Sequence, residues 1–93
     1  MFQALDATRA SRLDGVSVEI LDDYLRYCRD DRVLIVPLEY LYGENLVLIY
    51  APSIGRWELP HALEAIGTIE RGEILGELSD ALTVLGVKHR VEG

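Results

Sequence analysis

Cysteine is almost absent from this chain of 93 residues, and the one present, Cys28, has no partner for an intramolecular disulfide. A single cysteine also excludes the cysteine-rich zinc sites that stabilise many small domains. A nucleophilic role for Cys28 needs a neighbouring base, and neither His61 nor His89 lies at a spacing that indicates one. We therefore interpret Cys28 as a small core residue.

Long apolar runs are missing as well. A membrane-spanning helix needs about 20 consecutive apolar residues, and the longest run here, Val33–Leu38, is interrupted by Pro37. The first residues lack the layout of a signal peptide, in which a charged segment precedes an apolar one. We expect a cytoplasmic protein that does not bind membranes.

Positive charge is scarce: 9 Lys and Arg residues stand against 16 Asp and Glu residues, which gives a formal net charge of −7. A surface of this sign repels the phosphate backbone, so we expect no binding to nucleic acid. It suits docking on a basic protein partner instead. The length and the 49% hydrophobic content predict one domain, residues 1–93, with a modest core. Whether residues 1–15 are well ordered stays open.

The chain also lacks a convincing catalytic, metal-binding or nucleotide-binding motif. We therefore name no catalytic residue, no metal ligand and no cofactor, and the sequence favours a binding protein over an enzyme. What it does contain is a β-hairpin over Arg32–Ala51 that is apolar on both faces, with Gly43-Glu44 as its two-residue turn. Both faces need cover, which 93 residues hardly provide. We therefore expect a partner, either a second copy of the chain in a homodimer or another protein.

Outside the hairpin, the spacing of apolar residues predicts two main helices. One follows Ser17 and ends near Arg29, and the other covers about Ile69–Leu85 and ends at Gly86. We expect strands at Phe2–Ala7 and Val87–Val91, and a short helix at Pro60–Ile66. The predicted fold is α+β: a small antiparallel sheet with two main helices on one face, in an order compatible with a ferredoxin-like β-α-β-β-α-β arrangement.

The predicted helix at Ile69–Leu85 has three different faces on a helical projection. One is apolar and faces the core, and one carries small residues, among them Gly72 and Gly76. The third is a row of acids with no Lys or Arg four residues further on: Glu70, Glu73, Glu77 and Asp80. Such a row is either a solvated face, a docking surface for a basic partner or a set of ligands for a hard cation, although cation sites come mostly from wrapping loops.

The segment Leu46–Pro60, with its Trp-x-Leu-Pro ending, resembles the strand that precedes the Nudix box of the Nudix hydrolases. Fragments of the box itself resemble Ile69–Glu73 and Leu85–Val87. The resemblance implies a hydrolase that binds magnesium and a diphosphate. The decisive Arg-Glu-x-x-Glu-Glu motif is missing, so the implied relative is catalytically degenerate, with only Glu73, Glu77 and Asp80 left to bind metal.

Two functional hypotheses follow. The first is a small acidic protein-binding module, a dimeric regulator or inhibitor of a larger partner that acts by steric capture. The second is a small-molecule or nucleotide-binding domain, or a degenerate Nudix-like hydrolase, with a pocket near Glu39 and Trp57 at the dimer seam. The candidate binding residues are aromatic or acidic: Tyr40, Tyr42, Tyr50, Trp57, Glu70, Glu73, Glu77 and Asp80.

Overall fold

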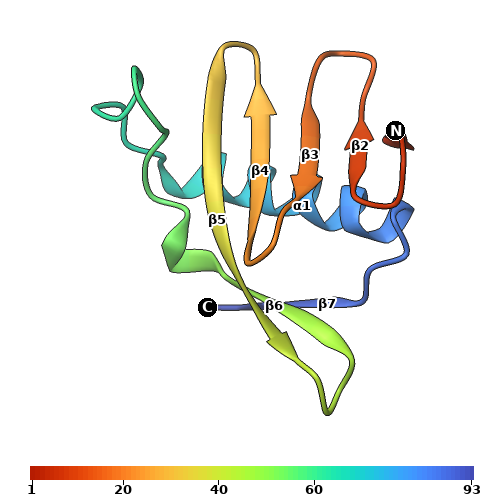
Figure 1. The fold of residues 1–93 in the computed structure, drawn as a ribbon. Helices are drawn as coiled ribbons and strands as arrows, with labels where there is room; N and C mark the ends of the chain where they lie inside the picture. Colours follow the sequence, from red (N-terminus) through yellow and green to blue (C-terminus); the bar gives the residue numbers. More distant parts are fainter.

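The computed structural model describes residues 1–93 as a curled sheet of seven strands, which are neighbours in chain order from β1 to β7, wrapped around one α-helix (Figure 1). The strands are β1 (Gln3–Ala4), β2 (Arg9–Ser11), β3 (Ser17–Ile20), β4 (Tyr24–Arg29), β5 (Arg32–Leu41), β6 (Leu46–Tyr50) and β7 (His89–Glu92); the helices are the short 3₁₀ helix η1 (Ala51–Ser53) and α1 (Thr68–Val84). All neighbours pair antiparallel except β6 and β7, which are parallel.

The predicted helix from Ser17 to Arg29 is wrong, because this segment forms the hairpin of β3 and β4. Val18 pairs with Tyr27 and Ile20 pairs with Leu25, which places these side chains on one face of the sheet. Successive side chains along β3 and β4 point alternately to the two faces of the sheet, as a strand with one buried face requires. Because this helix is absent, the prediction of two main helices in a ferredoxin-like arrangement is wrong as well. The fold is a mostly β half-barrel with a mixed sheet and one α-helix.

The predicted helix at Pro60–Ile66 is also wrong. Residues 54–67 form an irregular loop whose backbone groups bond across the loop rather than along a helix. Ile66 N–H donates to Gly55 O at 2.9 Å, and Glu58 N–H donates to Val33 O at 2.7 Å. The first bond closes the loop on itself, and the second fastens it to β5. At the N-terminus, the predicted strand Phe2–Ala7 is shortened to β1.

The hairpin of β5 and β6 has the predicted register, with Leu38 opposite Ile49 and Leu41 opposite Leu46. The turn differs, because the positive φ falls at Asn45 (+53°) and not at Gly43. Strand β5 pairs with β4 through its first half and with β6 through its second half. Pro37 sits where these pairings change. Since Leu38 N–H bonds toward β4, the missing N–H of Pro37 faces the side on which β6 has not yet begun to pair.

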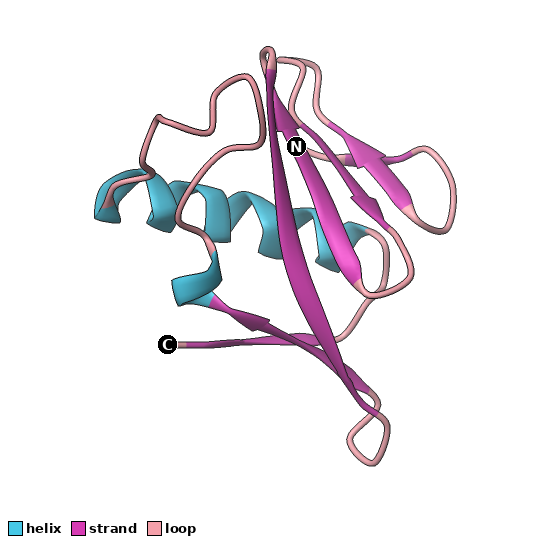
Figure 2. Ribbon diagram, turned by 60° about the vertical axis from the view of Figure 1, so that its left-hand side comes forward, coloured by secondary structure: helices cyan, strands magenta, loops and turns pink.

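Helix α1 confirms the expectation from periodicity. Its buried residues, Ile74, Leu78, Ala81 and Leu82, belong to the predicted apolar face, and Gly86 ends the helix with a φ of +74°. Figure 2 shows the helix on the concave side of the sheet. It is neither long nor apolar enough to cross a membrane.

The core lies between α1 and the curled strands. It joins buried residues of β2 to β6, such as Val18, Leu25 and Ile49, with those of α1, and no polar side chain is fully buried. Trp57 enters from the long loop and stacks on Tyr27, with ring centroids 6.2 Å apart. Trp57, at 2% exposed, is thus a core residue and closes one end of the half-barrel.

The chain itself covers part of the hairpin surface that was expected to need a partner. Leu48 and Ile49 point to opposite faces of β6, yet both are buried in the single chain. The strand is internal to the sheet, with β5 and β7 as neighbours. The homodimer therefore stays a prediction, with less apolar surface to explain it than the sequence alone indicated.

We predict that Trp57→Ala lowers the free energy of unfolding by about 3–5 kcal/mol, because it removes a large buried ring and leaves a cavity. Tyr42→Ala is the matched control: its ring is 87% exposed, and its loss should cost no more than about 0.5 kcal/mol. Urea denaturation of both variants measures the difference. Equal losses would contradict the placement of Trp57 in the core.

Candidate functional site

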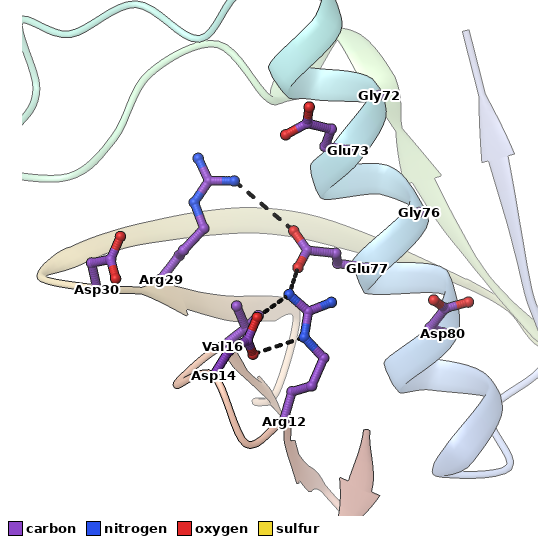
Figure 3. Close-up of a pocket in the computed structure, with 10 residues that line it drawn as sticks. All are labelled: Arg12, Asp14, Val16, Arg29, Asp30, Gly72, Glu73, Gly76, Glu77 and Asp80. Carbon is purple, nitrogen blue, oxygen red and sulfur yellow. Dashed lines mark hydrogen bonds and ion pairs between the residues drawn. The ribbon is translucent and has the colours of Figure 1, made fainter. Parts of the chain in front are cut away.

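A polar cleft of about 540 Å³ runs between α1 and one end of the sheet (Figure 3). The helix supplies its glycine and acidic faces, and the other wall comes from the β2–β3 loop and the β4–β5 turn. Ten residues line it: Arg12, Asp14, Val16, Arg29, Asp30, Gly72, Glu73, Gly76, Glu77 and Asp80.

Tight turns hold the sheet side of this cleft. In the β2–β3 loop, Arg12 N–H donates to Val16 O at 2.8 Å, and Gly15 completes the turn with a φ of +95°. The β4–β5 turn has two residues between the paired Arg29 and Arg32. Its first residue, Asp30, has a φ of +56°, a left-handed conformation that Asp tolerates better than most residues. Both turns lie at the same end of the sheet, and Arg12, Asp14 and Asp30 line the cleft opposite α1.

Glu77 is the centre of the polar contacts in the cleft. Its carboxylate accepts a hydrogen bond from Tyr27 Oη at 2.7 Å and forms ion pairs with Arg12 at 2.6 Å and Arg29 at 3.9 Å. The Glu77 side chain is only 14% exposed, so these contacts compensate its desolvation. Burial, reinforced by the neighbouring Glu77 carboxylate, raises the pKa of the Tyr27 hydroxyl well above its usual range. One carboxylate thereby ties the helix to two separate parts of the sheet.

Both arginines of the cleft are further engaged by acids at its edges. Arg12 binds Asp14 with two hydrogen bonds, at 2.8 and 2.6 Å, and this contact lowers the pKa of Asp14 to about 2. Arg29 binds Glu70 at 2.6 Å, and its guanidinium lies 5.3 Å from the centre of the Trp57 ring. Neither guanidinium is left without a carboxylate.

Three acids of the cleft have no such partner. Asp30, Glu73 and Asp80 are exposed, and none of these side chains makes a hydrogen bond or an ion pair within the chain. With five carboxylates against two guanidinium groups, the lining has an excess of three negative charges. The cleft therefore favours a cation.

The glycines on the helix side open the cleft. A Cβ atom added to Gly72 or Gly76 would meet no atom within 4 Å, so neither glycine is required by close packing inside the chain. Their missing side chains leave space directly above the helix backbone. The other small residues of this face have internal partners: Ser79 Oγ lies 2.8 Å from His89 Nε2, and Thr83 Oγ1 donates to Ser79 O.

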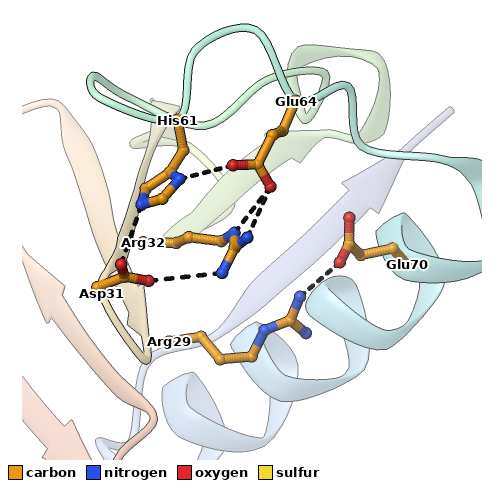
Figure 4. A network of polar contacts seen from close by, with 6 residues as sticks. All are labelled: Arg29, Asp31, Arg32, His61, Glu64 and Glu70. Atoms are coloured by element: carbon orange, nitrogen blue, oxygen red, sulfur yellow. Dashed lines mark hydrogen bonds and ion pairs between the residues drawn. The ribbon is translucent and has the colours of Figure 1, made fainter.

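A second polar network lies beside the cleft and holds the long loop against the β4–β5 turn (Figure 4). Glu64 accepts hydrogen bonds from Arg32, the shorter at 2.7 Å, and lies 2.6 Å from His61 Nδ1; His61 Nε2 lies 3.2 Å from Asp31. Arg32 and His61 together lower the pKa of Glu64. In this loop Leu59 and Leu63 are 83% and 93% exposed. The network thus holds the loop of residues 54–67, called the braced loop below, near the Arg29–Glu70 end of the cleft. Two apolar side chains on this loop are exposed to solvent.

The structure brings the acid row together in or beside the cleft, with Glu73, Glu77 and Asp80 in its lining and Glu70 paired at its end. It does not bring the aromatic candidates there. Tyr40 and Tyr42 lie at the far end of β5, a strand of ten residues and so about 30 Å long. Tyr50 is exposed and donates to Glu39, which raises the pKa of the tyrosine. Trp57 is in the core and Glu39 on the exposed hairpin.

Sequence reasoning missed the contribution of Arg12, Arg29 and Tyr27. They are separated by up to 17 residues and converge only because β3 and β4 pair as a hairpin, which the expected helix concealed. The signal that was available is the alternation of Val16, Val18 and Ile20.

Comparison with known protein families, with curated proteins and with solved structures finds no match for this chain. The structure contains no group of three or more His, Cys, Asp or Glu side chains placed to hold a metal ion.

We predict that Glu77→Gln lowers the free energy of unfolding by about 1.5–3 kcal/mol, because the amide keeps the shape of the side chain but removes the charge that Arg12 and Arg29 face. Asp80→Asn, on the same helix face but without a partner, should change it by no more than about 0.5 kcal/mol. Urea denaturation of the two variants measures both values. A loss at position 77 as small as that at position 80 would refute the central role of Glu77.

We predict that Gly76→Ala raises the free energy of unfolding by about 0.5–1 kcal/mol, since alanine favours the helix and its Cβ meets open space. Gly86→Ala should have the opposite effect, a loss of about 1–2 kcal/mol, because the φ of +74° is strained for alanine. Thermal unfolding of the pair separates the two cases. A Gly76→Ala variant that is less stable than the parent would show that the glycine has a packing role.

Proposed function

We propose that this chain is a cytoplasmic, acidic protein-binding module that captures a basic segment of a larger partner in the cleft along α1, and so regulates or inhibits that partner by steric capture. The observation that carries the proposal is the state of the charges in the cleft. Arg12 and Arg29 are already neutralised by internal carboxylates, whereas Asp30 and, on the helix, Glu73 and Asp80 remain free.

The open space above Gly72 and Gly76 supports a side chain of the partner as the occupant. A Lys or Arg side chain entering there passes between the free carboxylates of Glu73 and Asp80, one helical turn to either side of Gly76 and Glu77. A guanidinium group suits such a site well, because its donors match carboxylate geometry. The net charge of −7 adds long-range attraction and speeds the encounter.

The braced loop beside the cleft supplies apolar contact for the same partner. Leu59 and Leu63 are almost fully exposed while the loop that carries them is held by Arg32, Glu64 and His61. Apolar side chains on a preorganised loop cost little entropy on binding. We therefore propose Leu59 and Leu63 as the apolar anchor. The sequence favoured the hairpin tyrosines for this role, but they lie at the other end of β5.

The test uses a capped tetra-arginine peptide as a probe, titrated into ¹⁵N-labelled protein at low salt. We predict that the amide signals of Gly72, Glu73 and Gly76 shift together and saturate. In the double variant Glu73→Lys/Asp80→Lys the affinity should fall at least about tenfold, because both free carboxylates on the helix are reversed.

The control is Asp22→Lys/Asp23→Lys, which changes the net charge by the same amount in the exposed β3–β4 turn. It should keep the pattern of shifts at α1 with a smaller loss of affinity. An equal loss in both double variants, or shifts spread over the whole surface, would mean that only the net charge attracts the peptide and would overturn the proposal.

A further inference from the structure

A second cleft, of about 270 Å³, lies at the opposite end of β5 from the acidic cleft, between the tip of the β5–β6 hairpin and the connection from α1 to β7. Its walls are mainly apolar, and its polar groups are few. It is lined by Tyr40, Leu41, Tyr42, Asn45, Leu46, Val47, Gly86, Val87 and Lys88. Apolar walls with a few convergent polar groups are typical of small-molecule sites, and the volume is slightly below that of sites for drug-sized ligands.

Two stacked tyrosines form one wall of this cleft. The ring centroids of Tyr40 and Tyr42 lie 6.0 Å apart with an angle of 19° between the ring planes. Neither ring contributes to the core, and Tyr42 is 87% exposed. Aromatic pairs of this kind offer a flat surface on which another ring can stack.

Lys88 is the only lysine in the chain, and it supplies the cation of this cleft. Its ammonium group has no carboxylate within 4.0 Å. Glu92, four residues further along the chain, and Glu44, in the hairpin turn, both form ion pairs with Arg90 instead, at 2.8 and 3.7 Å. The backbone at Lys88 is fixed where β7 begins, since its carbonyl accepts the Val47 N–H at 3.0 Å. An unpaired cation beside an aromatic wall is unusual in a chain whose other basic groups mostly contact carboxylates.

We propose that this cleft binds a small aromatic carboxylate, with its ring against Tyr40 and Tyr42 and its carboxylate on the Lys88 ammonium. The charge of Lys88 selects an anion, and the apolar lining selects a ring over a short-chain acid. The Asn45 side chain, which also lines the cleft, offers an amide donor to the second carboxylate oxygen. This site is independent of the acidic cleft, which favours ligands of the opposite charge.

The experiment is an NMR titration of ¹⁵N-labelled protein with phenylacetate up to 20 mM, beside phenylacetamide and acetate. We expect saturable shifts with phenylacetate at Leu41, Tyr42, Val87 and Lys88, at a dissociation constant of about 1 mM, as small ligands of this size give. Phenylacetamide keeps the ring without the charge, and acetate keeps the charge without the ring. Each should bind at least about tenfold more weakly.

A variant with its control tests the charge contact. Lys88→Gln should reduce the affinity for phenylacetate about tenfold or more, since it removes a charged hydrogen-bond donor, and leave the weak binding of phenylacetamide unchanged. Arg26→Gln removes another exposed basic group outside the cleft and is the matched control. Equal affinity for phenylacetate and phenylacetamide, an equal effect of the two variants, or no saturable shift at these residues would overturn the proposal.

Discussion

The single helix is the only element available to fill the concave face of a seven-stranded sheet, and the rest of the structure depends on that constraint. The sheet curls because its inner residues must reach the one apolar face of α1, on which Ile74, Leu78 and Leu82 are fully buried. The polar face of the same helix then necessarily lies at the open side of the half-barrel. Glu77 sits at the boundary between these two faces, where its contacts with Arg12, Tyr27 and Arg29 fix how far the helix stands from the sheet edge.

The two clefts follow from the length and position of β5. Because this strand pairs with β4 along its first half and β6 along its second, it carries turns at its two ends that are far apart. One end meets the N-terminal half of α1 and its acids, and the other meets the C-terminal end of the helix at Gly86. The result is one small domain with an acidic cleft and an apolar cleft that has a free cation, so that groups of opposite charge line clefts at separate ends.

Local signals in the sequence predicted the elements whose residue pattern fits only one kind of secondary structure. The register of the β5–β6 hairpin, the helix ending at Gly86 and the row formed by Glu73, Glu77 and Asp80 were predicted in this way. The segment from Ser17 to Arg29 was not, because Val18, Leu25 and Cys28 fit a helical spacing. Val18 with Ile20, and Leu25 with Tyr27, fit a strand alternation equally well, and only pairing with β2 and β5 decides between the two patterns. The same error hid the convergence of Arg12 and Arg29, which is a property of the sheet and not of any local pattern.

The position of α1 after six of the seven strands has a consequence during synthesis on the ribosome. Strands β1 to β6 are joined by neighbouring hairpins and emerge first, whereas the helix that covers their concave face begins only at Thr68. Synthesis proceeds at about 5–20 residues per second. The inner face with Val18, Leu25 and Val36 therefore stays uncovered for several seconds after strands β1 to β6 have emerged. These strands are therefore most exposed to aggregation and to chaperones in the interval before α1 leaves the exit tunnel.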